Sequence, residues 1–236
     1  MAVGAEFCPR RLAAPGELAP YLRRWKSQGL GVQFVTPAVR EGAFEAVWAW
    51  LRAALEVAPG AEVAFNDWGL WERARAEGLA FRGVAGRLLS RQRRGPRVLG
   101  MVAAAAPREA RELRGSVWDE PEGVRLLEEF GAVGVELDLI LPGLRVPALP
   151  GGVTLRVHAP WIPVAVALAC PWTEAPLACD RPCRAAEPAC LRNDEDPHPL
   201  WSRGNTLFLR RESEPPAAYL ARLGAERLLW SPEIPG

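Results

Sequence analysis

The cysteines are the residues of this chain whose type and spacing could do chemistry most directly. There are five of them, four lying within 21 residues: Cys8, Cys170, Cys179, Cys183 and Cys190. Thiolates at this density form disulfides, hold zinc or hold an iron–sulfur cluster. Four thiolates suit a [4Fe–4S] cluster, and the three residues between Cys179 and Cys183 let both bind one cluster. Zinc is the alternative, because Cys190 or His198 could complete a tetrahedral site.

The sequence as a whole indicates the cellular compartment of these thiols. We expect a cytoplasmic protein with no membrane span, because the first residues lack a signal-peptide pattern and no run of 18 apolar residues occurs. In that compartment, clustered cysteines bind metal more often than they form disulfides. The net charge of +1 gives no overall electrostatic case for nucleic acid or a membrane surface.

Five other polar positions come at or near the ends of apolar, strand-like runs. Asn66 and Asp67 follow one such run; Asp67 suits the N-cap of a helix, which leaves Asn66 as a candidate for a binding site. Glu136 and Asp138 alternate on a later strand, so they share one side. Acid–base work is one interpretation of this pair, and simple exposure to water is the favoured one. His158 is interpreted as a structural histidine.

One stretch of the chain is densely basic and consists of Arg82, Arg87, Arg91, Arg93, Arg94 and Arg97. Most such runs form a solvated surface. Guanidinium groups also bind phosphates and carboxylates, so an anionic substrate, RNA or an acidic partner is the alternative interpretation.

The elements that must position these residues follow a strand–helix rhythm. Helical apolar periodicity marks residues 18–25, 44–55, 67–78 and 121–131. Strands are predicted at 2–7, 30–35, 62–65, 78–84, 98–102, 132–137, 153–157 and 162–169. This order predicts an α/β protein with an irregular or incomplete (β/α) TIM-like barrel. We expect a single domain over residues 1–236, with a Cys- and Pro-rich irregular segment from about residue 170.

In such a barrel the C-terminal ends of the strands meet on one face, where chemistry is done. Cys8 follows the first predicted strand and Cys170 ends the last one before the other cysteines. We therefore expect these two thiols, 162 positions apart, to become neighbours.

Several motifs occur in a familiar order: Gly4–Arg11 with its cysteine, Asn66–Gly69, Gly86–Arg97, the late cysteines and Gly204–Phe208. From residue 4 to about residue 209 the chain resembles the collagenase-like peptidase family, peptidase family U32. Within that family it is most similar to the UbiV- and UbiU-type iron–sulfur proteins of ubiquinone biosynthesis.

The resemblance implies an irregular barrel with an oxygen-sensitive [4Fe–4S] cluster, whose ligands would be Cys8, Cys170, Cys179 and Cys183. It implies oxygen-independent hydroxylation of a quinone precursor or an RNA base, in an enzyme or as one subunit beside a second family member. The pocket candidates are Asn66, Asp67 and Arg87. Two alternatives stay open: a collagenase-like peptidase, and a non-catalytic partner subunit stabilised by zinc or a cluster.

Overall fold

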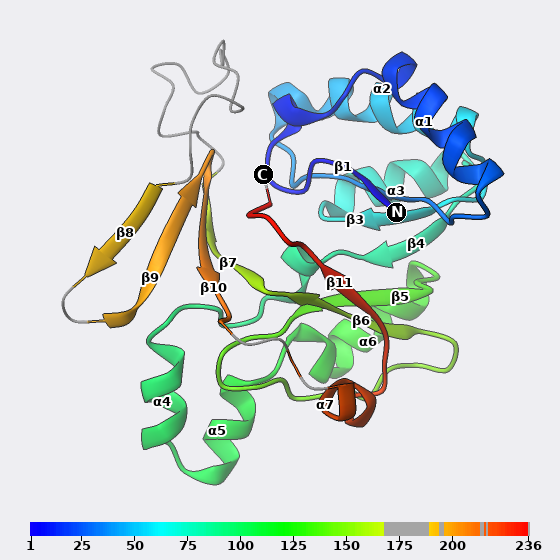
Figure 1. Ribbon diagram of the computed structural model, residues 1–236. Coiled ribbons are helices and arrows are strands. Elements are labelled where there is room, and N and C mark those ends of the chain that lie inside the picture. The colour runs from blue at the N-terminus through cyan, green and yellow to red at the C-terminus, as the bar shows by residue number, and fades with distance from the viewer. Residues whose placement is uncertain (168–188, 194–195, 213–214, 216, 236) are drawn as a thin grey trace.

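Seven parallel strands form a curled sheet that makes up part of a barrel (Figure 1). The computed structural model describes residues 1–236 except 168–188, 194–195, 213–214, 216 and 236. The strands, in spatial order, are β1 (Ala2–Gly4), β2 (Gln33–Val35), β3 (Glu62–Phe65), β4 (Arg82–Ala85), β5 (Gly134–Asp138), β6 (Thr154–Ala159) and β11 (Ala225–Trp230). The α/β class is confirmed, and because β1 and β11 are the two edges of this curled sheet, its form agrees with the predicted incomplete (β/α) barrel.

Four longer helices connect the first five strands, at the places where helices were predicted. They are α1 (Pro15–Ser27), α2 (Glu41–Val57), α3 (Trp68–Ala76) and α6 (Pro121–Glu129). Shorter elements are α4 (Val98–Ala104), α5 (Pro107–Leu113), α7 (Ala217–Arg222) and the 3-10 turns η1 (Pro9–Arg11), η2 (Arg87–Ser90) and η3 (Val117–Asp119). Within the described ranges, no helix has the length and apolarity needed to cross a bilayer.

The strand predicted at 98–102 is wrong, because these residues belong to helix α4. Val98 and Val102, four positions apart, lie on one side of this helix and pack with Leu113 of α5 in a small separate core. A following run of alanines, the best helix formers, favours the helix over a strand. A short apolar run by itself does not separate the two.

A second, antiparallel sheet projects from the barrel (left in Figure 1). Its order is β7-β10-β9-β8, with β7 (Trp161–Val166), β8 (Ala189–Asn193), β9 (Asp196–Arg203) and β10 (Thr206–Arg210). The strand predicted at 162–169 therefore exists over part of its length but leaves the barrel. The strands β8, β9, β10 and β11 were not anticipated from the sequence.

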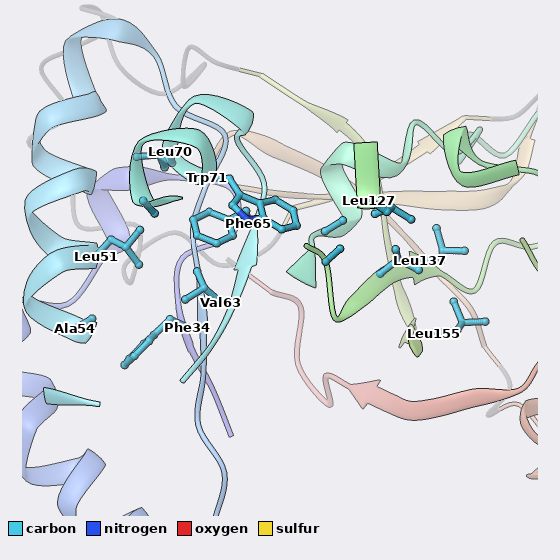
Figure 2. Packing of buried hydrophobic residues seen from close by; sticks show 14 of the residues in the cluster. Phe34, Leu51, Ala54, Val63, Phe65, Leu70, Trp71, Leu127, Leu137 and Leu155 are labelled. Carbon is cyan, nitrogen blue, oxygen red and sulfur yellow. The ribbon is translucent and has the colours of Figure 1, made fainter. Parts of the chain in front are cut away.

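The main core lies between the outer face of the parallel sheet and the helices that cover it (Figure 2). Its centre is Trp71 of α3, which stacks on Phe65 of β3 with ring centroids 5.0 Å apart. Gly83 of β4 makes room for the indole, because a Cβ there would lie 2.4 Å from the Trp71 ring. Since side chains alternate along a strand, the residues between these apolar positions point into the barrel.

Candidate functional site

The inner face of the parallel sheet is polar. Its inward-facing, buried or half-buried side chains include Gln33, Glu62, Glu136, Asp138, Arg156 and His158. Barrel interiors are ordinarily filled with branched apolar side chains. Buried charges are costly unless they are paired, so a paired polar interior is the strongest indication of a site in this chain.

Arg87 is the centre of the charged group at the C-terminal ends of the strands. It follows β4, is 2% exposed and binds both oxygens of Glu6, with Nε to Oε1 at 2.8 Å and Nη2 to Oε2 at 2.6 Å. Its Nη1 donates to Asp138 Oδ1 at 2.8 Å and to the Trp161 carbonyl at 3.1 Å. Burial alone would lower the pKa of Arg87, but Glu6 and Asp138 outweigh it and raise the pKa.

Asp138, at the end of β5, is held as a carboxylate by two arginines. Arg94 Nε donates to Asp138 Oδ2 at 2.5 Å, opposite the Arg87 contact. Burial would raise the pKa of Asp138, but the charges of Arg94 and Arg87 lower it instead. Gln92 accepts from the backbone N–H of Asp138 at 2.7 Å and donates to its carbonyl at 3.1 Å, which fixes the strand end.

Glu136 and His158 form a second pair one step deeper in the barrel. His158 Nε2 lies 3.0 Å from Glu136 Oε2, and Gln33 Nε2 donates to Glu136 Oε1 at 2.5 Å. Burial would raise the pKa of Glu136, but His158 and then Gln33 lower it. Glu136 is 1% and Asp138 0% exposed, so the interpretation that they face water is wrong.

A cavity of about 520 Å³, the lumen cavity, gives access to these groups. It is lined by Glu6, Arg87, Glu136, His158 and Gln33, together with residues of β1 and of the β11 end from Leu228 to Ser231. Because β1 and β11 are the unpaired edges of the sheet, the lumen cavity lies along the side where the barrel is incomplete.

Another charged layer closes the opposite, N-terminal end of the strands. Glu62 Oε1 accepts from Arg156 at 2.9 Å and Glu62 Oε2 from Arg227 at 2.7 Å. Burial would raise the pKa of Glu62, but these two arginines lower it. In (β/α) barrels this end serves stability rather than chemistry, and we assign that role to Glu62.

Of the three predicted pocket residues, Arg87 lines the lumen cavity, whereas Asn66 and Asp67 are not among its lining residues. Asn66 is 3% exposed; its amide donates to the Thr36 carbonyl at 2.9 Å and its oxygen accepts from Leu88 N at 2.9 Å. Asp67 is the predicted N-cap of α3, and its carboxylate accepts from backbone N–H groups of α3 and of the loop after β2. Both hold the loops around the barrel mouth.

The predicted cluster ligands are described only in part. Cys8 lies two residues beyond Glu6, half-buried at the start of η1. Cys170, Cys179 and Cys183 lie outside the described residues. Ala167, three positions before Cys170, is described, and Asn205 connects it to the loop of Cys8: its amide donates to the Phe7 carbonyl at 2.8 Å and to the Ala167 carbonyl at 2.7 Å.

The sequence reasoning missed two members of the charged group. Glu6 was part of a motif but was given no role, and Arg94 was one of six arginines in a run. Arg91, Arg93 and Arg97 of that run are exposed, whereas Arg87 and Arg94 turn inward. The signal that could have found them is the pair of carboxylates on β5, which would require cations if buried.

Comparison with protein-family models, with curated proteins and with solved structures finds no match for this chain.

Proposed function

We propose that the chain is an iron–sulfur protein of oxygen-independent hydroxylation, acting as an enzyme or as one subunit of it. Cys8, Cys170, Cys179 and Cys183 would hold a [4Fe–4S] cluster. A bound cluster would supply redox chemistry that requires no dioxygen. The substrate would be the aromatic ring of a quinone precursor or an RNA base. A second U32-like subunit would be the partner, and the protein would act in the cytoplasm.

The observation that carries this proposal is the bridge formed by Asn205. One side-chain amide holds the carbonyl next to Cys8 and the carbonyl three residues before Cys170. The described donor, Cys8, therefore lies beside the point where the chain enters the cysteine-rich segment. Cys170 follows Ala167 by three positions in the sequence, and together with Cys179 and Cys183 it would complete the four thiolates that the cluster requires.

The polar lumen supports a substrate site beside that position. Glu6, two residues before Cys8, lines the lumen cavity together with Arg87. A cavity of about 520 Å³ is within the usual size of small-molecule sites. Its buried, already paired charges offer a fixed set of donors and acceptors, so binding requires little reorganisation of the protein.

The test is anaerobic purification followed by iron and sulfide analysis and an absorption spectrum. We expect about four iron and four sulfide per chain, with the broad visible absorption of a cluster. Cys8→Ser should lose most of the iron. Cys190→Ser is the matched control, because Cys190 is an exposed thiol of β8 outside the proposed ligand set, and it should retain the iron. A colourless protein with one zinc per chain overturns the proposal.

The two alternatives predict other results. A collagenase-like peptidase would cleave gelatin or peptides, and chelators would stop the cleavage. A non-catalytic subunit stabilised by zinc or a cluster would show no turnover alone and would restore activity only in complex with its partner.

A further inference from the structure

We propose that Glu6, Glu136 and His158 bind one divalent first-row transition-metal ion in the lumen cavity, separately from the cysteine site. One ligand atom from each of the three side chains lies within 4.8 Å of the other two. Glu6 follows β1, Glu136 lies in the middle of β5 and His158 lies near the end of β6, so the barrel brings them together. This inference does not depend on the proposed function.

The donor chemistry selects the class of ion. Two carboxylate oxygens and one imidazole nitrogen suit Mn²⁺, Fe²⁺, Co²⁺ or Zn²⁺, whereas Mg²⁺ and Ca²⁺ prefer oxygen alone. With metal–ligand bonds of roughly 2.0–2.2 Å, ligand atoms lie about 3.3–3.6 Å apart around a tetrahedral ion and about 4.0–4.4 Å apart on opposite sides of an octahedral one. Atoms within 4.8 Å of one another therefore need only a small closing movement to bind the same ion.

Neighbouring groups hold both carboxylates in place. Arg87 binds Glu6 with two hydrogen bonds, and Gln33 binds Glu136 Oε1 at 2.5 Å. A carboxylate has about four lone-pair positions, so each retains capacity for a metal bond. Such outer partners orient metal ligands and commonly change affinity by about 10- to 100-fold.

The charge of the group also favours a cation. The group contains three carboxylates and two guanidinium groups: Arg87 pairs with Glu6 and Asp138, Arg94 pairs with Asp138, and Glu136 lies against His158. Counted without His158, the three carboxylates and two guanidinium groups carry one excess negative charge. An ion would replace the contact between His158 Nε2 and Glu136 Oε2, now 3.0 Å, with two metal bonds.

The lumen cavity determines what else the ion could bind. All three ligands line it, and the described part of the chain supplies three protein ligands to the group, which would leave coordination positions open. Water or an oxygen of a small molecule in the lumen cavity would occupy these positions. We therefore assign to the ion the binding and polarisation of an oxygen-bearing small molecule.

Titration of the metal-depleted full chain with MnCl₂, followed by the electron-resonance signal of free Mn²⁺, tests the site. Mn²⁺ is the probe because it prefers carboxylate and imidazole over thiolate ligands. We expect one ion per chain. His158→Gln and Glu136→Gln should each weaken binding about tenfold or more. His198→Gln is the matched control, since His198 is the chain's other histidine, and it should bind like the wild type.

The Cys8→Ser variant tests whether Mn²⁺ binding is independent of the cysteine site. It should bind Mn²⁺ as tightly as the wild type even where it has lost iron. The proposal is overturned if the wild-type chain binds no Mn²⁺ at millimolar concentration, if His158→Gln and His198→Gln bind alike, or if Cys8→Ser abolishes binding. Circular dichroism of each variant checks that it is folded, and the wild-type titration stands without any variant.

Discussion

The side-chain amide of Asn205 donates a hydrogen bond to the carbonyl of Phe7, 198 positions earlier in the chain. The same amide donates to Ala167, and the backbone N–H of Ala167 donates back to the Asn205 carbonyl at 2.8 Å. Asn205 thus joins the loop after β1, the end of β7 and the start of β10.

Removal of this bridge should reduce cluster retention. Asn205→Ala loses both side-chain donors, and we expect clearly less iron per chain after anaerobic purification than in the wild type. Thr206→Ser is the control, because it keeps the hydroxyl that donates to Asn205 Oδ1 at 3.2 Å, and its iron content should stay unchanged. Equal iron in Asn205→Ala and the wild type would show that the bridge does not position the proposed ligands.

Loss of Arg87 should destabilise the fold strongly. Arg87→Met leaves Glu6 and Asp138 without the buried cation between them, and breaking a buried ion pair in this way costs about 3–5 kcal/mol. Urea unfolding measures the change in the free energy of unfolding. Arg108→Ala, which removes a 93% exposed arginine paired with Glu112, should leave that free energy essentially unchanged. Similar stability of the two variants would contradict the central role of Arg87.

The acid limit of stability should depend on Glu62. Its pKa is lower in the folded chain than the ordinary value of 4.5, so the folded state binds its proton less readily than the unfolded state. Its contribution is complete above pH 4.5 and is lost as the pH falls from there through the folded pKa. Glu62→Gln should therefore show a shallower decline of unfolding free energy below pH 4.5, measured by urea unfolding across that range. Parallel curves for variant and wild type would rule this out.

Two helical glycines should respond oppositely to alanine. A Cβ on Gly123 of α6 would lie 2.1 Å from the Val117 carbonyl oxygen, so Gly123→Ala should destabilise by about 1–3 kcal/mol. Gly100 of α4 is exposed, and among the described residues a Cβ there would meet no atom within 4 Å beyond its chain neighbours and its own helix backbone, so Gly100→Ala should stabilise by about 0.5–1 kcal/mol. Thermal unfolding of both variants checks the pair, and a stabilised Gly123→Ala would contradict the close packing of α6 on η3.

Much of the fold could be predicted because local patterns act over short distances. Helical patterns are properties of consecutive turns, and α1, α2, α3 and α6 form where helices were expected. Antiparallel strands β8, β9 and β10 were missed because pairing between segments, rather than periodicity within one, decides them. Residues 98–102 show the same limit, since an apolar run suits either element until its neighbours are known.

For the site, the sequence by itself determined the donors: five thiols, two histidines, a strand with alternating carboxylates and an arginine-rich stretch. It also determined the βα order that brings strand ends to one face. Only the tertiary structure decided that Glu136 and Asp138 face a buried interior, that Arg87 and Arg94 turn inward to meet carboxylates, and that Glu6 lies close to His158. The physical reason is that burial and pairing are long-range properties: a charge is tolerated inside only where distant segments supply its partner, and the sequence alone does not show which segments meet.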